Sequence, residues 1–301
     1  MRLSRQSSLK WMSLANSFPL VRLMIRSLQL LFSVIITFAV FVSSASAIQV
    51  ETPTEQVAPA ETDSPKAEET KPDKPKRKGK AKPKGKPIWS LEPDPNLPNV
   101  LILGDSISIG YTLGVRKSLA EKANVFRPCS ADGRKPQNCQ GTTTGVKKIE
   151  KWLSGQKWDV IHFNWGLHDL KKVKGVGSLQ NSDDPNDPYQ ATVEQYSDNL
   201  RAIVEKLQAT KATLIFATTT PIVADSAGPH RAVEDPVRYN AAAIAIMEEN
   251  GIEVNDLYAV CDGKLEQLQR PKNVHFRHEG SVLLGQKVTA AIEAKLPAES
   301  E

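Results

Sequence analysis

The stretch Asn-Val-Leu-Ile-Leu-Gly-Asp-Ser, residues 99–106, is the part of the sequence that decides the fold. Its four consecutive branched aliphatic residues, 100–103, are typical of a strand that is buried on both faces of a parallel sheet. Gly104-Asp105-Ser106 follows directly, at the carboxyl end of that strand, where open α/β sheets place their ligands. Two interpretations of this turn stay open: Ser106 is an exposed nucleophile, or Asp105 or Ser106 caps the following helix.

Strand-like and helix-like stretches alternate along the rest of the chain, which is typical of βαβ units with a parallel sheet. We expect strands at 100–104, 124–127, 159–164, 213–218 and 252–254. Helices are expected at 115–122, 144–153, 190–208, 236–250, 257–267 and 280–296. About 200 residues are enough for one domain with a buried core. We therefore predict one α/β domain over residues 97–297.

The N-terminal 47 residues have the order of a secretory leader. Scattered basic residues precede an apolar run at 28–42, and Ala45-Ser46-Ala47 provides a small-residue cleavage site. The apolar run is shorter than the roughly 20 residues of a membrane-spanning helix. We predict a cleaved signal peptide at 1–47, with an uncleaved signal anchor as the alternative. The protein is then exported to the periplasm, the cell surface or the medium.

Residues 48–90 are rich in Pro, Glu, Thr and Lys and poor in apolar residues, which predicts a disordered linker. Its basic run at 74–86 holds eight Lys and Arg residues, and removing them from the formal net charge of +5 leaves about −3 for the remainder. The folded domain therefore offers no charge argument for nucleic acid, and none is expected as a partner. The basic run either contacts an anionic surface polymer or a membrane, or is a solvated linker without a partner.

The chain has three cysteines, and none of their spacings matches a zinc site. In an exported protein, Cys129 and Cys139 are expected to close a small disulfide loop, although the sequence leaves their connectivity open. Cys261 is then expected to be a buried thiol. We expect no metal site in this protein.

A long connection at 171–189 follows directly on the Gly-Leu-His-Asp segment at 166–169 and should lie beside the site as a lid or a binding loop. Its carboxylates Asp183, Asp184 and Asp187 do not have the spacing of a calcium loop. A solvated turn is the expected structure there.

Four short motifs follow one another along the domain: GDS with Ser106, CQGTTTG with Gly141, FNWGLHD with residues 166–169, and NVHFRHEG with His275. In this order they resemble the SGNH or GDSL hydrolase family of serine esterases and acyl hydrolases, over about residues 99–296. The resemblance implies a flavodoxin-like three-layer α/β/α sandwich with a mostly parallel five-stranded sheet. It also implies Ser106 as the nucleophile, His275 as the general base, and no cofactor.

The resemblance further implies an oxyanion hole made by the backbone N–H groups of Ser106 and Gly141 and by a side chain of the third motif. The family has Asn at that third position, and this chain has His168. A histidine can donate one N–H, and it would gain a charge below about pH 6.5. A structural role for His168 is the alternative. Asp105, Gly166 and Asp169 are expected to support the site.

The family normally carries an aspartate three residues before the histidine, and this chain has Lys272 there. We expect a backbone carbonyl to orient His275, which gives a Ser-His dyad. The alternatives are a carboxylate from Asp256 or Asp262, or the side-chain carbonyl of Asn273.

Together these features predict an exported serine ester hydrolase that acts through an acyl-enzyme and removes short acyl groups, such as acetyl, from carbohydrate. The substrate class comes from the likeness to secreted, esterase-type members of the family. The enzymatic alternatives are an O-acyltransferase or a lipid esterase on the same scaffold. A non-catalytic SGNH-like protein that binds polysaccharide is the alternative from another class. The partner is then a small-molecule or polysaccharide ester, and the oligomeric state is left open.

Overall fold

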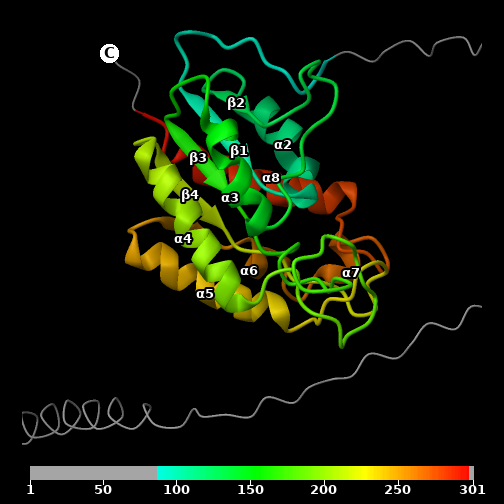
Figure 1. Ribbon diagram of the computed structural model, residues 1–301. Coiled ribbons are helices and arrows are strands. Elements are labelled where there is room, and N and C mark those ends of the chain that lie inside the picture. Colours follow the sequence, from blue (N-terminus) through cyan, green and yellow to red (C-terminus); the bar gives the residue numbers. More distant parts are fainter. Residues whose placement is uncertain (1–86, 298–301) are drawn as a thin grey trace, which may run out of the picture. The chain divides into compact units, whose positions relative to one another are not determined.

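The computed structural model describes residues 87–297 (Figure 1). The predicted signal peptide and nearly all of the predicted linker, with its basic run, lie outside the described residues. No helix within 87–297 combines the length and the apolar character needed to cross a membrane.

A single parallel sheet lies at the centre of the domain, with its five strands in the order β2-β1-β3-β4-β5. The strands are β1 (Asn99–Leu103), β2 (Asn124–Phe126), β3 (Val160–Phe163), β4 (Thr213–Ala217) and β5 (Glu253–Asn255). Val100 of β1 pairs with Val125 on one side and with Val160 on the other. The five predicted strands are therefore confirmed to within one or two residues at their ends.

Helices cover both faces of the sheet. They are α2 (Ser106–Ser118), α3 (Thr142–Leu153), α4 (Val193–Ala209), α5 (Asp235–Glu249), α6 (Leu257–Cys261), α7 (Leu265–Leu268) and α8 (His278–Glu293). Leu101 and Leu103 pack with α3, α4 and α5, whereas Val100 and Ile102 pack with α2 and α8. Because alternate residues of a strand face opposite sides, β1 joins two separate cores. This arrangement confirms the α/β fold and its three layers.

The first helix differs most from its prediction, since α2 begins at Ser106 rather than at 115. Asp105 caps it, and its side chain accepts a hydrogen bond of 2.8 Å from the N–H of Ile107. Gly110, Gly114 and several β-branched residues give this stretch a low helix propensity, so the range expected from the sequence began only at 115, although a cap at Asp105 was one of the two interpretations of the turn. Burial of its apolar side chains against α8 outweighs that preference.

The predicted helix at 257–267 is also different, because it is divided into the short helices α6 and α7. Asp256 caps α6 by accepting a hydrogen bond from the N–H of Ala259. Gly263 has a φ of +70° between the two helices, a conformation that favours glycine and ends the first helix.

The disulfide expected between Cys129 and Cys139 is not present, and all three cysteines are free thiols. Cys129 lies opposite Pro136 in an antiparallel bridge, so its neighbour across the loop is not Cys139. Cys139 is fully buried, and its N–H donates to the carbonyl of Gly104 at 3.1 Å. Cys261 is buried, as predicted.

The connection at 171–189 is folded by short antiparallel bridges between Lys172 and Tyr189 and between Val173 and Asn181. It is also tied to a second loop, because the carbonyl of Ser182 accepts a hydrogen bond of 2.7 Å from the N–H of His230. The loop therefore has backbone hydrogen bonds of its own, and its expected role as a lid or a binding loop stays a prediction.

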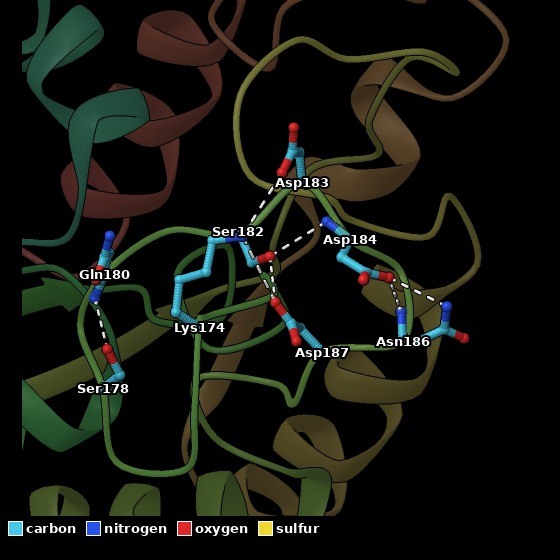
Figure 2. Close-up of polar contacts among 8 residues, drawn as sticks. All are labelled: Lys174, Ser178, Gln180, Ser182, Asp183, Asp184, Asn186 and Asp187. Carbon is cyan, nitrogen blue, oxygen red and sulfur yellow. Dashed lines mark hydrogen bonds and ion pairs between the residues drawn. The ribbon is translucent and has the colours of Figure 1, made fainter.

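The acidic residues of this loop build its turns, as Figure 2 shows. Asp187 accepts a short hydrogen bond from the hydroxyl of Ser182, and Asp184 accepts one of 2.8 Å from the N–H of Asn186. Lys174 forms ion pairs of 3.9 Å with Asp183 and with Asp187. These contacts agree with the expected turn, although the carboxylates are bonded to the chain as well as solvated.

A buried arginine holds the carboxyl end of β1. Arg127 is 4% exposed, and its guanidinium donates to the carbonyls of Gly104, Asp105 and Gln137 and to the hydroxyls of Ser108 and Thr112. These bonds fix the turn that carries Ser106. Their loss would leave several buried acceptors without donors.

We predict that Arg127→Met lowers the free energy of unfolding by about 2–4 kcal/mol, because buried hydrogen bonds to a charged group are lost. Arg201→Met is the matched control, since Arg201 is exposed and forms its ion pair with Glu249 at the surface. It should cost less than about 1 kcal/mol. Urea unfolding followed by circular dichroism measures both. Equal, small losses would contradict a structural role for Arg127.

Candidate active site

Ser106 is the first residue of α2, directly after the carboxyl end of β1. Its side chain is partly exposed, whereas Asp105 before it is 2% exposed. Burial raises the pKa of Asp105 above its usual range, and the bond from Ile107 and the charges of Arg127 and Arg231 oppose that rise. Asp105 therefore fixes the turn and leaves Ser106 open to solvent.

His275 contacts Ser106 across the chain, with its Nε2 atom 2.8 Å from the serine Oγ. Its Nδ1 atom is 2.7 Å from Oδ1 of Asn273. The same Oδ1 accepts the backbone N–H of His275 at 2.9 Å, which identifies it as the amide oxygen. Nδ1 must then donate its proton to Asn273, so Nε2 is free to accept the hydroxyl proton of Ser106.

The orienting group thus differs from the backbone carbonyl that we expected. Lys272 has a φ of +51°, and its carbonyl accepts the N–H of Ala227 at 2.8 Å instead of His275. Asp256 is bonded to Thr218 and caps α6, and Asp262 lies at the end of that helix. The side chain of Asn273, which the sequence left as an alternative, occupies the position beside Nδ1.

Burial lowers the pKa of His275 from its ordinary value, and this is the largest effect on the group. Asp105 raises the pKa in opposition, and Arg270 and Arg231 lower it further. The net result keeps the imidazole neutral at neutral pH. A neutral imidazole is the form that accepts a proton.

Two backbone N–H groups of the candidate site, those of Ser106 and Gly141, have no acceptor within residues 87–297. Gly141 is the N-cap of α3, so its N–H precedes the hydrogen bonds of that helix. A Cβ at Gly141 would lie 2.5 Å from Nε2 of Gln190 and 2.9 Å from Oδ1 of Asp169. A larger residue there would displace the side chains behind the turn, so packing favours glycine at this position.

His168 is partly exposed, and no hydrogen bond ties its ring to another described residue. Burial lowers its pKa to about 3, and the charges of Lys171, Arg231 and His275 lower it as well. The ring is therefore neutral over the whole working range of pH, in contrast to the titration below about pH 6.5 that we expected. A neutral ring can still donate one N–H.

Asp169 and Gly166 hold the third motif in place. Oδ1 of Asp169 accepts hydrogen bonds from the N–H of Thr142 at 2.8 Å and from its hydroxyl at 2.6 Å, which ties this motif to the start of α3. Burial raises the pKa of Asp169 to about 7, against the effect of the bonds from Thr142. A Cβ at Gly166 would lie 2.2 Å from the hydroxyl of Thr219, so a larger residue does not fit.

Arg231 is a residue near this site that the sequence analysis missed. Its Nε donates to the carbonyl of Leu167 at 2.9 Å, and its charge acts on both His168 and His275. It lies in a loop between β4 and α5, where no motif or periodicity distinguishes it from any other surface arginine. Within 87–297 no group of three or more His, Cys, Asp or Glu side chains is placed to hold a metal ion.

Solved structures with the same fold include a lipase/acylhydrolase from Enterococcus faecalis, with 21% identity and a TM-score of 0.52 over 68% of this chain and 100% of that chain. An acetyl xylan esterase, AlAXEase, has 14% identity and a TM-score of 0.51 over 64% and 99% of the two chains. The enzyme LAE5 from a Lake Arreo metagenome has 16% identity and a TM-score of 0.51 over 65% and 95%. No curated protein matches the sequence.

At the level of sequence families, the model of the GDSL-like Lipase/Acylhydrolase family matches residues 102–283, which is more than half of the chain. The match begins within β1 and ends within α8, so it includes Ser106, Gly141, residues 166–169 and His275. The chain therefore belongs to the GDSL-like lipase/acylhydrolase family and is an ester-hydrolysing enzyme.

Proposed function

We propose that this protein is an exported serine esterase that uses Ser106, His275 and Asn273 as a catalytic triad and removes short acyl groups from carbohydrate. One observation carries the mechanism. Ser106, His275 and Asn273 form a continuous chain of hydrogen bonds of 2.8 Å and 2.7 Å at the carboxyl end of the sheet. A nucleophile, a base and an orienting group in this order are what acyl transfer through a serine requires.

In the first half of the reaction, Nε2 of His275 takes the hydroxyl proton as Oγ of Ser106 attacks the ester carbonyl carbon. The tetrahedral intermediate collapses when the bond to the alcohol oxygen breaks, and His275 returns the proton to that leaving oxygen. Water then attacks the acyl-enzyme, again with His275 as the base. The acid is released and Ser106 regains its proton.

The negative oxygen of each tetrahedral intermediate needs donors that are already in place. The N–H groups of Ser106 and Gly141 are available because no described residue accepts them. Helix α2 also points its N-terminus towards this oxygen. His168 is the third donor in this proposal, in the position where the family has Asn.

Export and the carbohydrate substrate rest on the sequence. The predicted leader directs the chain out of the cytoplasm, and the lysine-rich run at 74–86 suits adhesion to an anionic surface polymer. An acetyl ester on a polysaccharide is an available substrate in that location. The fold shared with an acetyl xylan esterase is compatible with this substrate class.

Ser106→Ala and His275→Ala should each lower kcat for p-nitrophenyl acetate by at least about 10³-fold, because the nucleophile or its base is removed. A fluorophosphonate probe should label the unaltered enzyme and not Ser106→Ala. Ser130→Ala is a matched control, because Ser130 lies in the 129–139 loop and bonds only within it. Turnover that survives in Ser106→Ala would overturn the proposal.

Asn273→Ala should lower kcat on the order of 10- to 1,000-fold with a smaller change in KM, because the imidazole loses the acceptor that fixes its tautomer. Lys272→Asp, which restores the acid at the family's usual position, should not raise the rate, since Asn273 already accepts from Nδ1. Steady-state kinetics on both variants test this assignment. A faster Lys272→Asp enzyme with an unaffected Asn273→Ala enzyme would contradict it.

The acid limb of the kcat/KM profile should have its midpoint below the ordinary histidine value of 6.5, because the lowered pKa of His275 keeps the base neutral to lower pH.

His168→Ala should lower kcat about 10²- to 10³-fold through loss of a donor. His168→Asn should recover most of that loss. The acid limb should stay in place in both variants, since the pKa of His168 is about 3. A displaced limb would show that His168 titrates in this range.

A further inference from the structure

Two arginines lie near the carboxyl end of β1, and they are bonded differently. Arg127 is enclosed and donates to five acceptors of the protein. Arg231 donates only through Nε to Leu167 and through Nη1 to the carbonyl of Pro229 at 3.4 Å. Its Nη2 has no acceptor within residues 87–297, and this nitrogen is still reached by solvent. Nη2 of Arg231 is therefore open to a ligand.

The anchor of Arg231 is adjacent to the catalytic residues. The side chain of Leu167 packs with Val274 and Ile107. Val274 directly precedes His275, and Ile107 directly follows Ser106. The guanidinium of Arg231 is thus held by the carbonyl of Leu167, and the side chain of Leu167 packs beside the residues next to Ser106 and His275.

The positive charge of Arg231 has no ion-pair partner among the described residues. Asp105 is the acid that acts on it, but the Asp105 carboxylate accepts from Ile107 rather than from Arg231. Burial lowers the pKa of Arg231 to about 10. Lys171 stands nearby as a second cation, and burial and the charge of Arg231 lower its pKa. Partly buried charges of one sign are costly to hold, and an anion between or beside them would be stabilised.

The loop that carries Arg231 is fixed before any ligand binds. The N–H of His230 donates to Ser182 at 2.7 Å, and the carbonyl of His230 accepts the N–H of Lys172 at 2.9 Å. Ser182 is itself held by the hydroxyl bond to Asp187 (Figure 2). This network gives the guanidinium a defined position, which is what selective recognition of a planar anion requires.

We propose that Arg231 binds a carboxylate group of the substrate beside the scissile ester, so that the preferred substrate is an acylated uronic acid residue of an acidic polysaccharide. This inference rests on the proposed esterase function. A planar carboxylate matches the edge of a guanidinium. A single arginine whose Nη2 alone is without an acceptor suits a monoanion better than a phosphate, which carries more charge and more acceptor oxygens. A neutral acylated sugar would leave the guanidinium unpaired.

The test compares methyl glycosides of O-acetyl glucuronic acid and O-acetyl glucose, with acetyl at the same hydroxyl, by acetate release. The value of kcat/KM should be about 10- to 100-fold higher for the glucuronic acid than for the glucose derivative, because a hydrogen bond to a charged group contributes a free energy of that size. Arg231→Gln should bring this ratio close to one, mainly through KM for the acid, and Arg231→Lys should keep part of it. Arg201→Gln, which removes one exposed charge on α4, should retain the full ratio.

A second measurement does not depend on how well a variant folds. Glucuronate should inhibit hydrolysis of p-nitrophenyl acetate by the unaltered enzyme, and glucose should not. Equal hydrolysis of the acidic and neutral sugars, or a preference for an acetylated sugar phosphate, would overturn the inference. Hydrolysis of p-nitrophenyl acetate that does not need Ser106 would instead overturn the proposed function.

Discussion

The packing of α2 against α8 is the constraint on which the candidate active site depends. Ser106 begins one of these helices and His275 lies just before the other, although 169 residues separate them in the chain. Tyr111 and Val115 of α2 pack in the same apolar cluster as Leu284 and Val288 of α8. The distance from His275 to Ser106 is therefore set by a hydrophobic core rather than by the hydrogen bond itself. That bond alone is too weak to hold two such segments together.

The sequence predicted the parts of the fold that follow from burial patterns. Continuous apolar runs such as 100–103 mark strands that are covered on both faces. The short strands β2 and β5 lack such a run and were located from the alternation of strand-like and helix-like stretches. Helix α2 was missed over most of its length, because two glycines and several β-branched residues oppose a helix locally. Its formation depends on tertiary contacts with α8, which a local pattern does not contain.

In the candidate site, too, some residues could be predicted from the sequence and others could not. Ser106, Gly141, His168 and His275 were located by motifs, and the structure brings them to one end of the sheet. The orienting residue was not settled, because the turn before His275 contains Lys272 in a left-handed conformation. In this structure Asn273, one residue further along, presents its side chain to the imidazole. Arg231 could not be found at all, since its place depends on hydrogen bonds between two loops that are distant in sequence.

The network in the 171–189 loop has a consequence for the thermodynamics of binding. Its turns and ion pairs are formed within the protein, and they extend through His230 to Arg231. The loss of conformational entropy in these residues therefore belongs to the folding reaction rather than to the encounter with substrate. Less conformational entropy is then lost in these residues when an ester binds at the neighbouring site.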